Sequence, residues 1–134
     1  MSIKAAFAIP FAKFIQKKVN KWANAPLKTQ EKVFKNLISQ AKNTAFGKDH
    51  GFSSIRNYED FKARVPVVDY EGLRHYVDRV VEGESDVLWK GKPLYFAKTS
   101  GTTSGAKYIP ITKESMPTHV KSARNALLLY IAQT

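Results

Sequence analysis

A short loop of hydroxyl-bearing residues, glycines and one lysine is the part of this sequence best suited to chemistry. It reads Thr-Ser-Gly-Thr-Thr-Ser-Gly-Ala-Lys over residues 99–107. The segments on either side, 93–97 and 108–112, are largely apolar and predict β-strands. Such a loop can turn tightly, point backbone N–H groups and hydroxyls into one concavity and add a cation, as binding of a phosphate chain requires. The sequence therefore predicts a nucleotide-phosphate loop.

A flexible linker or a simple hairpin turn is the alternative for this loop. The close apolar strands, the interleaved glycines and hydroxyls, and the position of Lys107 just after Gly105 favour phosphate binding. The loop is not a Walker A motif, which has four residues between its glycines and a lysine directly after the second one. Here three residues separate Gly101 from Gly105, and Ala106 precedes the lysine.

The composition is that of one modest globular domain. The chain has 134 residues, of which 43% are hydrophobic and 12% aromatic, so disorder throughout is not expected. The absence of cysteine excludes a disulfide framework, a thiolate metal site and a cysteine nucleophile. The three histidines are far apart and lack the spacing of a zinc site. Lysines interrupt the apolar start of the chain, which argues against a secretion signal, and we expect a cytoplasmic protein.

The positive charge is concentrated near the N-terminus. The net charge is +11, and residues 1–48 hold ten lysines against one acidic residue, Glu31, which gives +9. One hypothesis is therefore a stand-alone basic module that binds nucleic acid or an anionic membrane through its first two helices. A basic face on a larger protein explains the same charge, and on this interpretation we expect neither a nucleic-acid nor a membrane partner.

Hydrophobic periodicity divides the chain into an amphipathic basic helix over residues 1–26 and a second part over residues 27–134. We expect the aromatic residues of the first helix to enter a core. Four further helices are predicted, with caps at Thr29, Asn57, Asp69 and Ser115. The helix after Thr29 should end near a left-handed Gly47, and the one after Asp69 near Gly83. In the helix that follows Thr29, the residues predicted to be buried are Val33, Phe34, Leu37, Ile38, Ala41 and Ala45.

The predicted fold class is α+β, dominated by helices. It has a two-stranded β segment, with one strand on either side of the phosphate-binding loop. Two strands alone are only marginally stable in water. We therefore expect this segment to be part of a larger domain.

Residues 100–107 resemble the phosphate-binding motif of acyl-adenylate-forming enzymes. The context is similar to the N-terminal part of the auxin-responsive acyl-acid amido synthetases. The similar stretches run from about Thr29 to the end and are strongest over residues 58–112. They are Tyr58-Glu59-Asp60-Phe61, Val65-Pro66-Val67-Val68-Asp69-Tyr70-Glu71, Val81-Glu82-Gly83-Glu84, Leu88-Trp89 and Tyr108-Ile109-Pro110-Ile111-Thr112. One departure is minor: Thr99 stands where members often have a serine.

This resemblance implies a ligase that converts ATP and a small carboxylic acid into an acyl-adenylate and pyrophosphate, after which an amine or amino acid displaces AMP. It implies contacts to the ATP phosphates from Ser100, Gly101, Thr102, Thr103, Ser104, Gly105 and Lys107. The Mg²⁺ ligands are expected outside this segment, in the remainder of the same enzyme, and we assign no catalytic residue or metal ligand within it. The isolated chain is predicted to be inactive. An acyl-CoA ligase of the same superfamily is the alternative enzyme.

The other titratable and aromatic residues give weaker signals. Glu82 and Glu84 are interpreted as a solvated helix end rather than a paired acid site, and Asp69 as a helix cap. His75 is expected at the surface or in packing, and Trp89 in the core.

Overall fold

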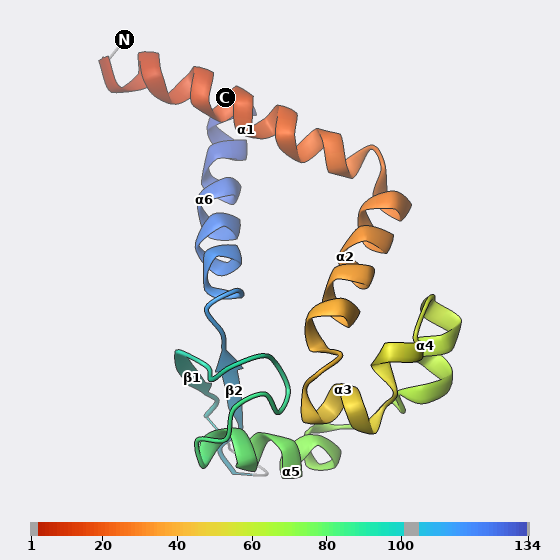
Figure 1. Cartoon of the computed structure of the whole chain (residues 1–134). Helices are drawn as coiled ribbons and strands as arrows, with labels where there is room; N and C mark the ends of the chain where they lie inside the picture. The colour runs from red at the N-terminus through yellow and green to blue at the C-terminus, as the bar shows by residue number, and fades with distance from the viewer. Residues whose placement is uncertain (1–2, 101–104, 134) are drawn as a thin grey trace. The chain divides into compact units, whose positions relative to one another are not determined.

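The computed structural model describes residues 3–100 and 105–133, with side chains from residue 8 onwards. Helices dominate, and one pair of antiparallel strands accompanies them, so the predicted α+β class is confirmed (Figure 1). In chain order the elements are α1 (Ile3–Ala23), α2 (Pro26–Ala41), α3 (Ala45–Asp49), the 3₁₀ helix η1 (Phe52–Ser54), α4 (Tyr58–Arg64), α5 (Tyr70–Val81), β1 (Tyr95–Lys98), β2 (Tyr108–Ile111) and α6 (Met116–Gln133). They form two compact units, residues 1–31 with 114–134, and residues 32–113.

In the first unit, α1 packs against α6. Ala12 and Ile15 of α1 are buried with Leu128 of α6, and Val19 lies partly buried beside them. Figure 1 shows the blue C-terminal helix ending against the red N-terminal one. The small Ala12 is fully buried, which allows the two helices to approach closely. The contact is therefore made by small and aliphatic side chains.

The aromatic residues of α1 whose side chains the structure describes do not enter this core. Phe11, Phe14 and Trp22 are 46%, 52% and 55% exposed, so the prediction that they are buried is wrong. They share the apolar character of Ala12 and Ile15 but lie on neighbouring parts of the helix surface. A narrow contact with a single helix covers only part of so wide an apolar stripe.

The second helix begins earlier than predicted. Pro26 is the first residue of α2. A proline is tolerated there because the N–H of a first helical residue has no partner within the helix. Thr29 is therefore not the cap. Its hydroxyl instead donates to the carbonyl of Trp22 at 3.3 Å.

The second unit has two adjoining hydrophobic clusters. Ile38 and Ala41 of α2 are buried with Phe52 and Ile55, and Trp89 packs against this group, as predicted for that residue. Tyr76 and Val80 of α5 form the other cluster with Val87. Phe46 of α3 packs against both clusters. The short α3 therefore links α2 to α5.

The predicted stripe of α2 is only partly buried. Ile38 and Ala41 are in the core and Phe34 packs against it, but Val33 and Leu37 are 52% and 48% exposed. The stripe is wider than the face that the second unit covers, so its outer members remain at the surface.

The end of α2 also differs from the prediction. The helix stops at Ala41, and Gly47 lies inside the separate helix α3 rather than in a left-handed cap. Thr44 caps α3: its hydroxyl accepts from the Gly47 N–H at 3.0 Å and donates to the Ala41 carbonyl at 2.7 Å. A Cβ added at Gly47 would lie 2.1 Å from the Ala41 oxygen. Glycine is thus required here by the close approach of two backbones.

The caps of α4 and α5 are confirmed. The side chain of Asn57 accepts from the Asp60 N–H at 2.9 Å, and that of Asp69 accepts from the Gly72 N–H at 3.0 Å. The fifth helix ends at Val81, shortly before Gly83, as predicted. Asp69 therefore fixes the position at which α5 begins, with Tyr70 as its first residue.

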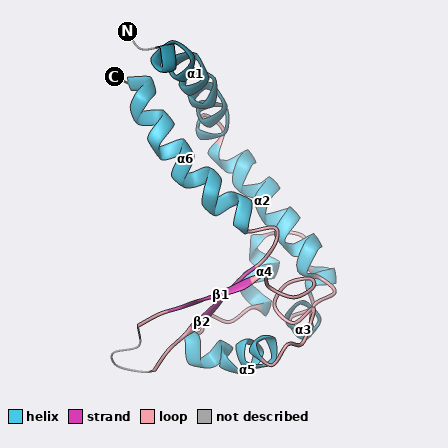
Figure 2. Cartoon of the chain, turned by 90° about the vertical axis from the view of Figure 1, so that its left-hand side faces the viewer, coloured by secondary structure: helices cyan, strands magenta, loops and turns pink. Residues whose placement is uncertain are grey.

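Strands β1 and β2 form an antiparallel pair, visible as magenta arrows in Figure 2. Each strand has four residues, and the register pairs Tyr95 with Ile111 and Lys98 with Tyr108. The ring of Phe96 meets that of Tyr108 edge-on at 6.2 Å. The pair positions the two ends of the loop at residues 99–107.

Candidate functional site

The two ends of the loop are joined directly beyond the strands. The Thr99 N–H donates to the Lys107 carbonyl at 3.0 Å, and the Lys107 N–H lies 3.3 Å from the Thr99 hydroxyl oxygen. The first bond extends the backbone ladder between β1 and β2 by one residue pair, and the second adds a side-chain contact at the same pair. The loop therefore leaves and re-enters the hairpin at a closed neck, unlike a linker.

Three of the predicted phosphate-binding residues lie in the described part of the loop. Ser100 is exposed beside the neck, Gly105 has a φ of +82°, and Lys107 is half-buried. A Cβ added at Gly105 would have no neighbour within 4 Å, so this glycine is needed for its left-handed backbone rather than for space. The other four, Gly101, Thr102, Thr103 and Ser104, lie outside the described residues.

Tyr70 of α5 contacts the loop exit and was not found by reasoning from the sequence. Its hydroxyl accepts a hydrogen bond from the Tyr108 N–H at 2.9 Å. The ammonium of Lys107 lies 5.4 Å from the centre of its ring, within range of a cation–π interaction. Only the position of Tyr70 within the Val-Pro-Val-Val-Asp-Tyr-Glu stretch could have drawn attention to it.

The donors at the neck suit an anionic ligand. A serine hydroxyl, a glycine with an accessible backbone and a lysine ammonium lie on the same short loop. Hydrogen bonds from a cation to phosphate oxygens are among the stronger ones, and a backbone without a Cβ allows close approach. The described part of the loop therefore offers a hydroxyl, an accessible backbone and a cation to a ligand.

The acidic residues considered earlier have structural roles. The Arg79 guanidinium donates two hydrogen bonds to Glu84, at 2.7 and 2.6 Å, at the end of α5. These bonds lower the pKa of the Glu84 carboxyl below its ordinary value. Glu82 is exposed nearby. His75 is exposed as well, with its ring 4.0 Å from that of Tyr76. Their arrangement is that of a solvated helix end and a surface histidine, as predicted.

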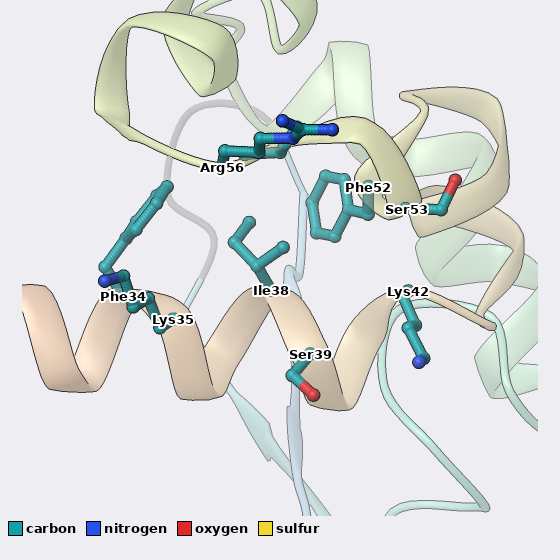
Figure 3. Close-up of a pocket in the computed structure, with 9 residues that line it drawn as sticks. Phe34, Lys35, Ile38, Ser39, Lys42, Phe52, Ser53 and Arg56 are labelled. Carbon is teal, nitrogen blue, oxygen red and sulfur yellow. The ribbon is translucent and has the colours of Figure 1, made fainter.

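The second unit has two hollows besides the described ends of the loop. The first, of about 190 Å³, has an apolar floor, and Figure 3 shows Phe34 and Ile38 of α2 facing Phe52 beneath Arg56. Lys35, Lys42 and Arg56 also line it, and no acidic residue does. The second, of about 440 Å³, lies between α3, α4 and α5 and is mostly apolar. Neither hollow is lined by a described residue of the loop.

Comparison with known proteins identifies the family. The model of the GH3 family N-terminal domain matches residues 15–133, nearly the whole chain. The chain belongs to the GH3 family. The match begins inside α1 and includes the hairpin, its loop and α6. The predicted relationship to the acyl-acid amido synthetases is therefore confirmed.

Individual GH3 proteins resemble the chain over much of its length. It is 35% identical over 105 residues to indole-3-acetic acid-amido synthetase GH3.15 of Arabidopsis thaliana, which covers 75% of this chain and 17% of that protein. It is 31% identical over 91 residues to jasmonoyl–L-amino acid synthetase JAR6 of Nicotiana attenuata, covering 66% and 16%. The chain thus spans less than a fifth of the length of these GH3 relatives.

Two further observations concern the described residues. They bring together no group of three His, Asp or Glu side chains that could hold a metal ion. None of their helices combines the length and apolar character needed to cross a bilayer.

Proposed function

We propose that this chain is the N-terminal part of an ATP-dependent amido synthetase that joins a small carboxylic acid to an amine or amino acid. The GH3 relatives are named as synthetases that conjugate indole-3-acetic acid, or jasmonate to an amino acid, which supports this reaction class. The observation that carries the proposal is the closed neck of the loop. The Thr99–Lys107 hydrogen bond holds the lysine and the left-handed Gly105 at the mouth of the hydroxyl-rich segment.

In the proposed reaction, a carboxylate oxygen of the acid bonds to the α-phosphorus of ATP and pyrophosphate leaves. The amine then attacks the acyl carbon, and AMP leaves with the formation of the amide. The hydroxyls and backbone amides of residues 100–105 hold the phosphate oxygens. The ammonium of Lys107 offsets the negative charge that grows on the departing pyrophosphate. Electrostatic stabilisation of this kind requires that the lysine be held in place before the reaction.

We assign the other functions of the enzyme to parts of the protein outside residues 1–134. These are binding of the adenine and ribose, coordination of Mg²⁺, and the pocket for the acid. On this proposal the isolated chain does not form an adenylate, and the complete enzyme acts in the cytoplasm. Nucleic acid and membrane are not among its partners.

The test measures acid-dependent exchange of labelled pyrophosphate into ATP by the complete enzyme that carries this chain. Thr102→Ala and Lys107→Ala should each lower the rate of exchange about a hundredfold, to a residual level that can still be measured, while the thermal midpoint of unfolding stays unchanged. Lys113→Ala is the matched control, because Lys113 is exposed just after β2 and lies outside the loop. Exchange by the isolated chain, or full exchange by Lys107→Ala, would contradict the proposal.

The acceptor is tested separately with the same protein. Amide formation with amino acids, and no thioester formation with coenzyme A, is expected. Thioester formation alone would instead identify an acyl-CoA ligase that uses the same loop.

A further inference from the structure

Tyr70 contacts the loop exit through two different parts of its side chain. Its hydroxyl accepts from the Tyr108 N–H at 2.9 Å, and its ring lies 5.4 Å from the Lys107 ammonium. Lys107 and Tyr108 lie 37 and 38 positions after Tyr70 in the sequence, so α5 and β2 meet here through tertiary structure. One side chain therefore touches both the residue that ends the loop and the residue that begins β2.

The position of Tyr70 is fixed from its own side of the contact. It is the first residue of α5, directly after the cap residue Asp69, whose carboxylate accepts from the Gly72 N–H at 3.0 Å. A Cβ on Gly72 would lie 2.8 Å from the Cβ of Val68, so the segment before the helix packs closely on its first turn. Val65, at the start of this segment, packs against the core of the second unit. Tyr70 is thus anchored to the core and not to the loop alone.

The hydrogen bond from Tyr108 supplies a partner that the sheet does not provide. In an antiparallel pair, successive residues direct their N–H groups alternately toward and away from the partner strand. Thr99 and Lys107 are hydrogen-bonded to each other, so the N–H of the next residue, Tyr108, faces away from β1. The Tyr70 hydroxyl accepts that outward bond and so fixes where β2 starts.

We propose that Tyr70 is a positioning residue for the phosphate loop: its hydroxyl sets the place of the loop exit, and its ring sets the direction of the Lys107 ammonium. This inference rests on the proposed function of the loop. It also gives a physical reason for two separate stretches of sequence to occur together. The Val-Pro-Val-Val-Asp-Tyr-Glu stretch presents the tyrosine, and the hairpin presents the lysine on which it acts.

Two variants separate the contributions of the hydroxyl and the ring. Tyr70→Phe removes the bond to Tyr108 but keeps the ring beneath Lys107, whereas Tyr70→Leu removes both. Tyr58→Leu is the matched control. Tyr58 is also the first residue of a capped helix and has a lysine, Lys62, 6.0 Å from its ring. It is exposed, and this ring contact involves no described residue of the loop.

The readout is pyrophosphate exchange by the complete enzyme, with kcat and KM for ATP measured separately. Tyr70→Phe should raise the KM for ATP about fivefold with little change in kcat, as expected for the loss of one hydrogen bond that positions the binding loop. Tyr70→Leu should in addition lower kcat about fivefold, because Lys107 loses its orientation. Tyr58→Leu should change neither constant.

A double-mutant cycle with Lys107→Ala distinguishes positioning from general support of the fold. If the ring acts through the lysine, Tyr70→Leu should lower kcat much less in the Lys107→Ala protein than in the protein with Lys107. Equal effects of Tyr70→Leu on kcat in both proteins, or an unchanged KM in Tyr70→Phe, would overturn the inference. If Tyr70→Leu does not fold, the KM of Tyr70→Phe decides. If Lys107→Ala alone leaves exchange intact, the proposed function of the loop fails instead.

Discussion

Tyr76 of α5 donates a hydrogen bond of 2.7 Å to the carboxylate of Asp49, the last residue of α3. Tyr76 is 5% exposed, and its ring meets that of Phe46 edge-on. Burial, and then the bond to Asp49, raise the pKa of the Tyr76 phenol above its ordinary value. The bond joins the two helices that the Phe46 side chain also connects.

This pair predicts a dependence of stability on alkaline pH. The folded state holds the phenolic proton more tightly than the unfolded state, whose tyrosine has a pKa of about 10. The resulting stability is fully present below about pH 10 and is lost as the pH rises through the raised pKa of the folded state.

Tyr76→Phe should lower the free energy of unfolding by about 1–2 kcal/mol at pH 8. The difference from the unaltered chain should shrink above about pH 10, as measured by urea denaturation. Tyr58→Phe, at an exposed position, should show neither effect, and a difference that grows with pH would contradict the prediction.

Thr44 is predicted to stabilise the turn between α2 and α3 through its hydroxyl. It is 1% exposed and both donates and accepts a hydrogen bond there. Thr44→Val keeps the shape of the side chain but leaves the buried Gly47 N–H without its partner, so it should cost about 1–3 kcal/mol. Thr44→Ser keeps both bonds and should cost clearly less. Urea denaturation of the two variants measures the difference, and equal losses would show that the hydroxyl does not matter.

Gly47 is predicted to tolerate no side chain. An added Cβ would meet the Ala41 carbonyl oxygen at 2.1 Å, and a backbone atom cannot move aside as a flexible side chain can. Gly47→Ala should therefore destabilise the chain by about 3 kcal/mol, although alanine favours helices. Lys48→Ala, at the next and exposed position, serves as the control and should change stability by less than about 0.5 kcal/mol. A stabilising Gly47→Ala in thermal unfolding would show that α2 and α3 are not this close.

The basic residues at the hollow of Figure 3 are predicted to play no part in the proposed adenylation reaction. Replacement of Lys35, Lys42 and Arg56 by alanine should make any binding to single-stranded RNA less dependent on salt. The slope of log K against log salt concentration should fall by up to about 2. Pyrophosphate exchange by the complete enzyme should remain unchanged. The hypothesis of a basic module makes a different demand: strong RNA binding that survives Lys107→Ala. Loss of exchange in the triple variant would place these cations in the reaction.

Local chemistry explains which parts of the fold were predictable from the sequence. Asn57 and Asp69 cap helices through bonds to residues only three positions away, so their neighbours suffice to identify them. The role of Gly47 depends on the carbonyl of Ala41 beyond a turn, which hydrophobic periodicity does not reveal. Likewise, Leu37 has the apolar character of a core residue but is 48% exposed.

The candidate site shows the same division. The hairpin around the loop follows from its apolar flanks, its glycines and its hydroxyls, all within a short stretch. Tyr70, in contrast, reaches the loop from 38 residues away, and neither spacing nor composition indicates that contact. Sequence reasoning therefore identified the loop but not the side chain that supports its exit.

Pro110 affects which edge of the β1–β2 pair can bind a further strand. It pairs with Phe96 and, like Tyr108, belongs to the alternate set of residues on β2 whose nitrogen atoms face away from β1. Pro110 has no hydrogen to offer there, and the hydrogen of Tyr108 is already taken by Tyr70. A third strand would find no free donor at either position of β2, whereas Phe96 and Lys98 of β1 turn their N–H groups outward. We therefore expect any further strand of the proposed enzyme to pair on the β1 side, which leaves the Tyr70 contact undisturbed.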